Sequence, residues 1–355
     1  MPDETSFRFN PLRGIPRKKS HPAIHIILFA FTVLTTVIAG TAWAFKDYTE
    51  AYNWHYGITY SILILTFLSS HEFGHYFAAR YHKVDATLPY YIPAPNFIMP
   101  FGTFGAVIRT RTAISSKIAL FDIGAAGPLA GFIVSVGFLI YGLMTLPGIE
   151  YIYNIHPEYL FKYGGKIPKT NLFFGDTALF SILAKYFANP AGFLPPMNEI
   201  YHYPFLCVGW FGLFVTSLNL LPIGQLDGGH ILYAMFGKRQ GIIARFVWWG
   251  MIVIGIGSLL NLLILLLQDD SPGRILIFLR NNILPGLNWL KNVVPWYFET
   301  WTGWIFWAIL TRIVIKLDHP QIGDDKPLGS ARTILGWLII VIIFLCFSYN
   351  GIYII

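Results

Sequence analysis

The chain has 355 residues, of which 55% are hydrophobic and only 12% are charged, with a net charge of +7. Its mean hydropathy is +0.55. A soluble protein of this length carries about 25% charged residues, so a soluble enzyme, a disordered scaffold and a secreted disulfide-framework protein are all disfavoured. The composition favours an α-helical membrane protein with several spans.

Neither the basic residues nor the cysteines indicate a class of protein other than a membrane protein. Five of the 25 Lys and Arg residues lie within the first 20 positions, and no basic block interleaved with aromatic residues follows. This pattern favours a signal for membrane topology, and we expect no nucleic-acid partner. Cys207 and Cys346 lie in apolar runs, where we expect them to be buried as small hydrophobic residues.

The hydrophobic runs predict an all-α polytopic membrane protein with about seven transmembrane helices. A short β-strand is expected at 102–112, between the second and third spans, and a long loop at 147–202. A segment at 275–290 is a candidate interfacial or re-entrant helix. The predicted spans are 23–45, 57–80, 117–146, a fourth from 203 that is interrupted at 220–224, 241–267, 301–316 and 333–347.

The distribution of Lys and Arg predicts the orientation of these spans. Cytosolic loops carry an excess of basic residues close to the span ends. The basic tail at 1–20 is therefore expected in the cytosol, together with the loops near 80–117, 238–245 and 316–332. We expect an integral, multi-pass protein of the plasma membrane, with its N-terminus in the cytosol.

The second span contains the motif His71-Glu72-Phe73-Gly74-His75. Residues i and i+4 lie on one face of a helix, so both imidazoles can reach one metal ion. In such a motif the glutamate lies beside the metal-bound water and takes its proton. Because ionisable side chains are costly at membrane depth, this cluster indicates a bound divalent cation. The alternative is a polar patch that faces a water-filled cavity, as in a transporter.

Asp227 is the best candidate for the third protein ligand that a catalytic zinc site needs. It follows an apolar segment at 205–221 and a helix break at Pro222 and Gly224. Irregular backbone at membrane depth is tolerated only in a protein interior or beside a cavity, so we expect this carboxylate to be paired or metal-bound. The alternative is an N-cap for a helix that starts near Gly228.

These motifs together resemble the site-2 protease family of intramembrane zinc metalloproteases. The resemblance rests on HEFGH in one transmembrane helix and on Asn219, Pro222 and the Leu-Asp-Gly-Gly run with Asp227 in a later one. The glycine-rich segment at 124–131 also resembles that family, although close helix packing alone would account for its small residues. We take 57–240 as the catalytic transmembrane core, 21–56 as the first span and its loop, and 241–355 as C-terminal transmembrane helices.

The resemblance implies an enzyme with one zinc ion per chain, bound by His71, His75 and Asp227, with Glu72 as the catalytic base. It implies cleavage of a peptide bond in or near a transmembrane helix of a membrane-protein substrate within the bilayer. It further implies that Asn219 binds the substrate backbone or the developing oxyanion, although a buried amide that supports the turn is an equal alternative. No other cofactor is expected.

Three further histidines and the strand carry weaker expectations. His230 is interpreted as a loop or capping residue, with a contact to the metal site as the alternative, and His25 and His55 as structural or interfacial residues. The strand at 102–112 is expected to hold an extended substrate by strand addition, or else to plug the cavity.

Two other functions stay open at this stage. The first is a transporter or channel in which the His and Glu residues relay protons or metal ions. The second is an inactive relative of the proteases, against which the intact Glu72 argues. The sequence predicts neither the oligomeric state nor the identity of the substrate.

Overall fold

The computed structural model describes residues 21–169, 172–269, 273–324 and 326–354. The predicted cytosolic tail at 1–20 lies outside the described residues. The helices, from α1 to α14, are Pro22–Trp43, Ile58–Tyr81, Lys117–Met144, Glu150–Ile155, Glu158–Phe161, Ala178–Phe187, Pro204–Asn219, Asp227–Phe236, Gln240–Gln268, Arg274–Asn282, Leu284–Val293, Pro295–Phe298, Gly303–Leu310 and Ser330–Cys346. Short 3₁₀ helices cover Ala51–Gly57 (η1), Ile200–His202 (η2) and Gly237–Arg239 (η3), and a π-helical turn covers Thr311–Ile315 (η4).

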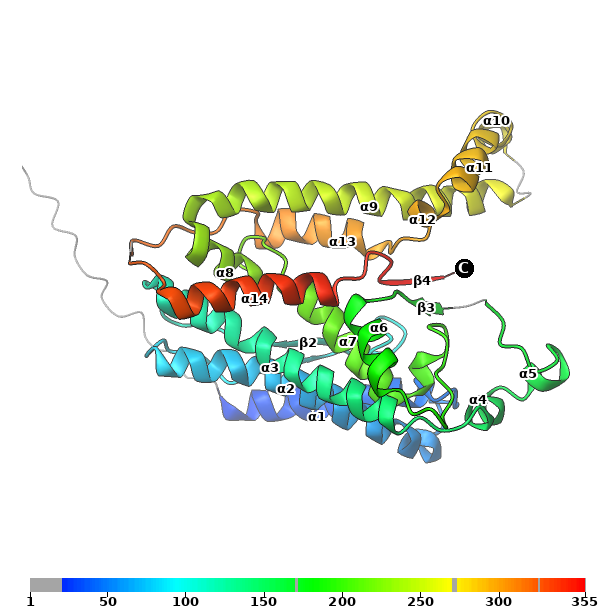
Figure 1. Ribbon diagram of the computed structural model, residues 1–355, viewed down its shortest axis with the longest axis horizontal. Helices are drawn as coiled ribbons and strands as arrows, with labels where there is room; N and C mark the ends of the chain where they lie inside the picture. Colours follow the sequence, from blue (N-terminus) through cyan, green and yellow to red (C-terminus); the bar gives the residue numbers. More distant parts are fainter. Residues whose placement is uncertain (1–20, 170–171, 270–272, 325, 355) are drawn as a thin grey trace, which may run out of the picture.

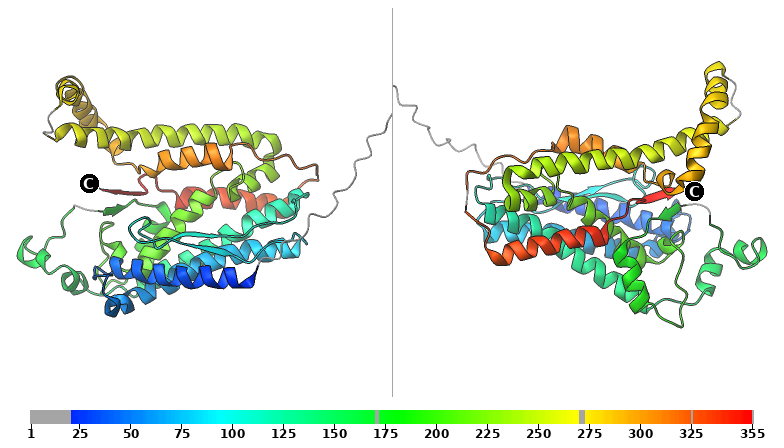
Figure 2. Two further views of the ribbon diagram at one scale, coloured as in Figure 1. Left: turned by 180° about the vertical axis from the view of Figure 1, so that it is seen from behind. Right: turned by 45° about the horizontal axis from the view of Figure 1, so that its top comes forward.

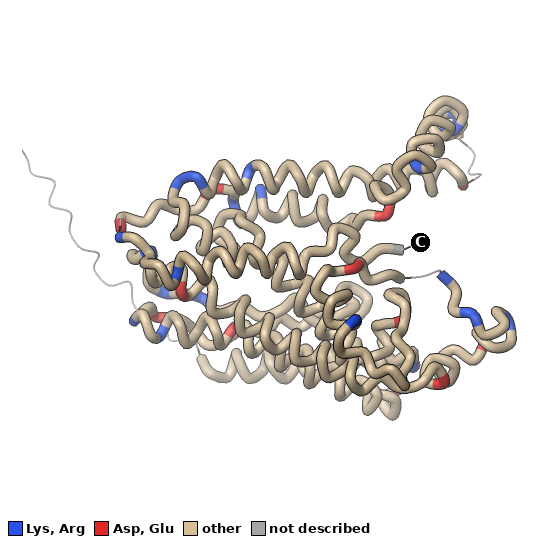
Figure 3. The backbone as a smooth tube through the Cα atoms, in the orientation of Figure 1, with Lys and Arg blue, Asp and Glu red and all other residues tan. Residues whose placement is uncertain are grey.

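The long helices form a bundle in which their axes run roughly side by side (Figures 1 and 2). Helix α3 packs against α2, α7 and α8, while α9 packs against α13. The helices α1 and α2 lie on one side of the bundle and α9 lies on the other (Figure 1). Lys and Arg residues gather towards the two ends of the bundle, and the stretches between are mostly uncharged (Figure 3). This arrangement is the one expected of a protein that crosses a membrane.

Among the described residues, three segments are long and apolar enough to cross a membrane on their own: Pro22–Trp43, Lys117–Met144 and Asp227–Gln268. Helices also occupy the other predicted spans, but α7 has 16 residues and α14 has 17. At about 1.5 Å per residue, these two are shorter than the roughly 30 Å hydrocarbon core of a bilayer. The chain is a mostly helical integral membrane protein, and the number of seven spans stays a prediction.

The described residues contain two small antiparallel sheets. Strand β1 (Tyr90–Pro93) pairs with β2 (Thr103–Val107) between α2 and α3, and Tyr90 lies opposite Val107. Strand β3 (Leu172–Phe174) pairs with the C-terminal β4 (Ile352–Ile354). The sequence does not predict the second sheet, because its strands are three residues long and about 180 positions apart.

The segment at 147–202, predicted as a loop, is largely folded, so that prediction was wrong. It contains α4, α5, β3, α6 and η2. Helix α6 is capped by Thr177, whose hydroxyl accepts a hydrogen bond from the Phe180 N–H at 3.1 Å. Its Phe180 and Leu183 side chains are buried in the main core. The many polar residues and prolines of this segment favoured a loop prediction, although they flank the short amphipathic helix α6.

The C-terminal part packs directly on the segment that contains the helix break. The Gly224 N–H donates to the Leu317 carbonyl at 2.9 Å. The Gln240 side-chain amide donates to the Pro222 carbonyl at 2.9 Å and to the Leu317 carbonyl at 3.1 Å. The break between α7 and α8 is thus held in place by residues that lie far beyond it in the chain.

Candidate active site

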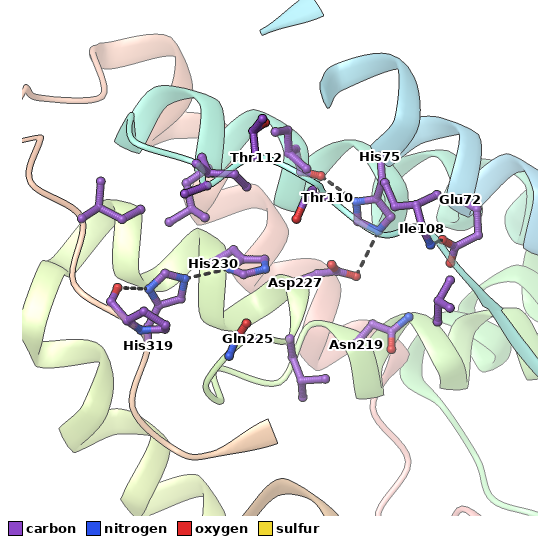
Figure 4. A pocket seen from close by; sticks show the side chains of 18 of the residues that line it. Glu72, His75, Ile108, Thr110, Thr112, Asn219, Gln225, Asp227, His230 and His319 are labelled. Atoms are coloured by element: carbon purple, nitrogen blue, oxygen red, sulfur yellow. Dashed lines mark hydrogen bonds and ion pairs between the residues drawn. The ribbon is translucent and has the colours of Figure 1, made fainter. Parts of the chain in front are cut away.

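Three side chains from two distant helices converge on one point. His71 and His75 lie one turn apart on α2, and Asp227 is the first residue of α8. The two Nε2 atoms are 3.1 Å apart, and each lies 3.4 Å from the Asp227 Oδ2 atom (His75 and Asp227 in Figure 4). Both histidines are buried. The structure therefore brings together the three residues that the sequence picks out as metal ligands.

The spacing of these donor atoms fits a zinc ion. Ligand atoms at about 2.0–2.1 Å from a tetrahedral zinc lie about 3.3 Å from one another. The His75 Nδ1 lies 2.7 Å from the Ile123 carbonyl, so this nitrogen carries the proton and donates it. The Nε2 lone pair is then directed at the other donors, as in a histidine that binds a metal.

The alternative role of Asp227 as an N-cap is wrong. Helix α8 begins at Asp227, and its N-cap position is occupied by Leu226 in an extended conformation. Two glycines allow this start to pack tightly on the preceding break. A Cβ on Gly228 would collide with the Leu220 carbonyl, and one on Gly229 with the Gly224 carbonyl. The carboxylate is left free to turn towards α2.

A glycine of α3 makes room for the His75 imidazole. A Cβ added at Gly127 would overlap the His75 ring, and one at Gly131 would lie 3.3 Å from the His71 Nδ1. The spacing of these small residues predicts close helix packing, and the structure adds that the packing partners include the two histidine rings. Helix α3 thus forms the wall behind the candidate metal centre.

Glu72 lies next to this centre and is held by the end of strand β2. Its carboxylate is buried, with 6% of the residue exposed. One oxygen, Oε2, accepts a hydrogen bond from the Ile108 N–H at 2.9 Å (Figure 4). Because only one oxygen is occupied by this bond, the other remains able to accept a proton.

Asn219 ends α7 and lies on the same side of the cavity as the metal ligands. Its amide nitrogen is 3.3 Å from the His71 Nε2. This contact is compatible with both predicted roles, the substrate-binding amide and the amide that supports the turn. The role of Asn219 therefore stays a prediction.

These residues line a cavity with a volume of about 580 Å³. Its far wall carries His230 and His319, whose Nδ1 and Nε2 atoms are 2.8 Å apart (Figure 4). The interpretation of His230 as a loop or capping residue was wrong, because His230 lies inside α8. Burial lowers the pKa of His319, so this ring is neutral at pH 7.

Sequence analysis missed His319 entirely. It lies 89 positions beyond its partner His230, in a polar segment without a recognisable motif. Its backbone N–H donates to the Gln240 side chain at 3.1 Å, which fixes the segment against the break. No spacing rule connects residues that meet in this way.

The two isolated histidines have local roles. The His25 Nδ1 lies 3.0 Å from the Pro89 carbonyl, and its ring lies 4.1 Å from that of Tyr90. The His55 Nδ1 lies 2.7 Å from the Tyr52 carbonyl. Both contacts agree with the structural roles predicted for these residues.

A helix with two histidines and a glutamate, completed by an aspartate at the start of a second helix, defines a metallopeptidase-like centre. The model of the family described as "Peptidase family M50" matches residues 59–262, which is more than half of the chain. The chain belongs to this family, and the resemblance to the site-2 proteases is thereby confirmed.

Relatives in plants carry names that agree with this assignment. The chain is 29% identical over 278 residues to "Probable zinc metalloprotease EGY1, chloroplastic" of Oryza sativa subsp. japonica, covering 77% of this chain and 42% of the relative. It is 28% identical over 205 residues to "Probable zinc metalloprotease EGY2, chloroplastic" of Oryza sativa subsp. indica, covering 58% of this chain and 34% of the relative. The chain spans less than half the length of these relatives. No solved structure matches it.

Proposed function

We propose that this chain is an intramembrane zinc endopeptidase that hydrolyses peptide bonds in or near transmembrane helices of membrane-protein substrates. The observation that carries the proposal is the convergence of His71, His75 and Asp227 beside the buried carboxylate of Glu72. Family membership supports it, and so do the names of the zinc metalloprotease relatives.

The three converging residues would hold the zinc ion, which supplies the Lewis acidity that peptide hydrolysis needs at neutral pH. Glu72 takes the proton of the attacking water on its unoccupied oxygen and returns it to the leaving amine. The Ile108 N–H keeps the carboxylate in place while this proton is exchanged. The Asn219 amide would donate a hydrogen bond to the oxyanion that develops at the substrate carbonyl.

The substrate backbone must be extended before it can be cleaved, and strand β2 offers an edge for it. Ala106, Val107 and Ile108 line the cavity next to Glu72. An extended segment that pairs with this edge would present its peptide bonds to the metal centre. Strand β1 already occupies the other edge of β2.

We place the N-terminus in the cytosol and the cavity within reach of cytosolic water. His75 lies five residues before Arg80, close to the end of α2 that is predicted to be cytosolic. The membrane we propose is the plasma membrane. The chloroplastic location in the names of the relatives makes a plastid membrane the second candidate.

The proposal is tested with protein reconstituted into liposomes together with a set of transmembrane peptides, whose fragments are identified by mass spectrometry. Glu72→Gln is the matched variant, because it removes the base and keeps the shape of the side chain. We expect the cleavage rate to fall by about 10²–10⁴-fold, with an unchanged zinc content.

Two results would contradict the proposal. Equal cleavage by both proteins would assign the activity to another enzyme or another residue. An absence of cleavage, combined with ion movement across the liposome membrane, would favour the transporter alternative.

A further inference from the structure

A second cluster of two histidines and a carboxylate lies outside the catalytic cavity. His156 follows α4, Glu199 precedes η2 and His202 ends it. The His202 Nδ1 lies 2.9 Å from the carbonyl of Trp43, the last residue of α1. The cluster therefore lies at the end of the bundle where α4 and α5 are found, opposite the end at which α1 begins (Figure 1).

The donor atoms of this cluster have nearly the arrangement of the candidate active site. The Nε2 atoms of His156 and His202 are 2.9 Å apart. The Glu199 Oε2 atom lies 3.5 Å from the His202 Nε2 and 3.9 Å from the His156 Nε2. The corresponding distances in the active site are 3.1, 3.4 and 3.4 Å. Both sets of atoms surround a point that a tetrahedral metal ion could occupy.

The hydrogen bonds of the two rings direct their lone pairs at each other. The His156 Nδ1 donates to the Glu158 carboxylate at 2.8 Å, and the His202 Nδ1 donates to the Trp43 carbonyl. In a neutral imidazole the remaining nitrogen is then an acceptor. Two facing acceptors at 2.9 Å repel each other unless a cation lies between them.

The Glu199 carboxylate is a second reason to expect a cation at this cluster. Glu199 is fully buried, and its Oε2 atom has no hydrogen-bond partner among the described residues. The other oxygen, Oε1, accepts hydrogen bonds from the Tyr159 hydroxyl at 2.8 Å and from the Asn198 amide at 3.2 Å. An unpartnered, buried carboxylate oxygen is costly, and it faces the two imidazole lone pairs.

Neighbouring residues hold the two imidazole rings in place, as residues behind metal ligands usually do. The Tyr159 ring stacks on the His156 ring, with centroids 4.7 Å apart. Each histidine donates its other ring N–H to a carboxylate or a carbonyl, which is the usual arrangement for metal-binding histidines. His156 is 5% exposed and His202 is 1% exposed, so a bound ion would be shielded from solvent.

We propose that His156, Glu199 and His202 bind a second zinc ion, which has a structural role. A site with two imidazoles and one carboxylate binds zinc in preference to calcium or magnesium, because those two cations take oxygen ligands. The ion would cross-link the segment after α4 to the segment before α7, and the hydrogen bond from His202 to the Trp43 carbonyl would tie both to the end of α1. The described part of the chain has no disulfide to do this, since both of its cysteines are buried and free.

The test is the zinc content of the full-length protein, purified in detergent from cells grown with added zinc and measured by elemental mass spectrometry. We expect two zinc ions per chain in the wild type, one in Asp227→Ala, one in Glu199→Gln and none in the double variant. His55→Gln, which changes an exposed histidine between α1 and α2, is the control and should retain two. Cobalt offers a second readout, because Asp227→Ala loaded with Co²⁺ should show the visible absorption of a site with nitrogen and oxygen ligands.

The proposal is overturned if the wild type holds one zinc and Asp227→Ala holds none and binds no added Zn²⁺ or Co²⁺. That result would mean that a proton, not a metal, separates the two rings. If Glu199→Gln does not fold, His156→Gln takes its place. The zinc contents of the wild type and Asp227→Ala are in any case sufficient to decide whether the second cluster binds a metal. Failure of the peptidase proposal would appear separately, in the cleavage assay with Glu72→Gln.

Discussion

At the scale of single residues, the position of the His75 imidazole depends on the absence of a side chain at Gly127. The ring occupies the volume that a Cβ at this position would take. The Ile123 carbonyl, one turn earlier on α3, then accepts the Nδ1 proton. One helix therefore both makes room for the proposed ligand His75 and sets its tautomer.

Gly127→Ala should weaken zinc binding at the catalytic centre. Overpacking of a buried site costs about 1–3 kcal/mol, which corresponds to roughly a 5- to 150-fold loss of affinity. The matched control is Gly137→Ala on the same helix, where a Cβ meets nothing within 4 Å. The measurement is competition with a zinc chelator of known affinity, and equal affinities in both variants would contradict this role of Gly127.

At the scale of the elements, the site depends on a helix break that a distant segment holds in place. The sequence predicts the break from Pro222 and Gly224, and the resemblance links Asp227 to the histidines of α2. It does not predict that the segment after η4 supplies Leu317 and His319 to this region, because those contacts follow no periodicity. Motifs with helical spacing were predictable, whereas contacts made by irregular segments were not.

The same limit applies to the cluster of His156, Glu199 and His202. His156 and His202 are 46 positions apart in a segment predicted as a loop. Only the folding of α4, α5 and η2 brings them together. The HEFGH motif was recognisable because both of its histidines lie on a single helix.

Strand β2 offers a prediction about substrate binding. The Ile108 N–H points to Glu72 and away from β1. Because N–H groups alternate in direction along a strand, the Ala106 N–H should point to the same side. Ala106→Pro would remove one hydrogen bond to an extended substrate, worth about 0.5–1.5 kcal/mol, and lower kcat/KM by roughly 2- to 10-fold.

Ala106→Gly is the control for this substitution, because it removes the side chain and keeps the N–H. Zinc content should be the same in both variants. If Ala106→Pro cleaved transmembrane peptides as efficiently as Ala106→Gly, pairing of the substrate with this edge would be excluded.

At the scale of the whole molecule, Lys and Arg residues lie towards both ends of the bundle, with mostly uncharged stretches between them (Figure 3). Because successive spans alternate in direction, the predicted cytosolic loops put the connection between α1 and α2 and the segment that contains α4 and α5 outside the cytosol. The turn between α8 and α9, with Lys238 and Arg239, is predicted inside. The cluster of His156, Glu199 and His202 would then face the side opposite the cytosol, whereas the cavity with Glu72 would be open to cytosolic water.

Single cysteines can test this orientation, since Cys207 and Cys346 are both buried. Lys162→Cys and Lys238→Cys each introduce a thiol at an exposed position. In intact bacterial cells that express the protein, a membrane-impermeant maleimide should label Lys162→Cys, and it should label Lys238→Cys only after permeabilisation. The reverse pattern would invert the topology.

The central claim is that His71 and His75 of α2 and Asp227 of α8 form one zinc site. The most direct measurement is the zinc content per chain of the purified wild type beside Asp227→Ala, with both proteins shown to be monodisperse. The variant should contain one zinc ion fewer per chain than the wild type, whether or not the second cluster binds a metal. An equal zinc content in the two proteins would contradict the claim, because the carboxylate would then not be a ligand.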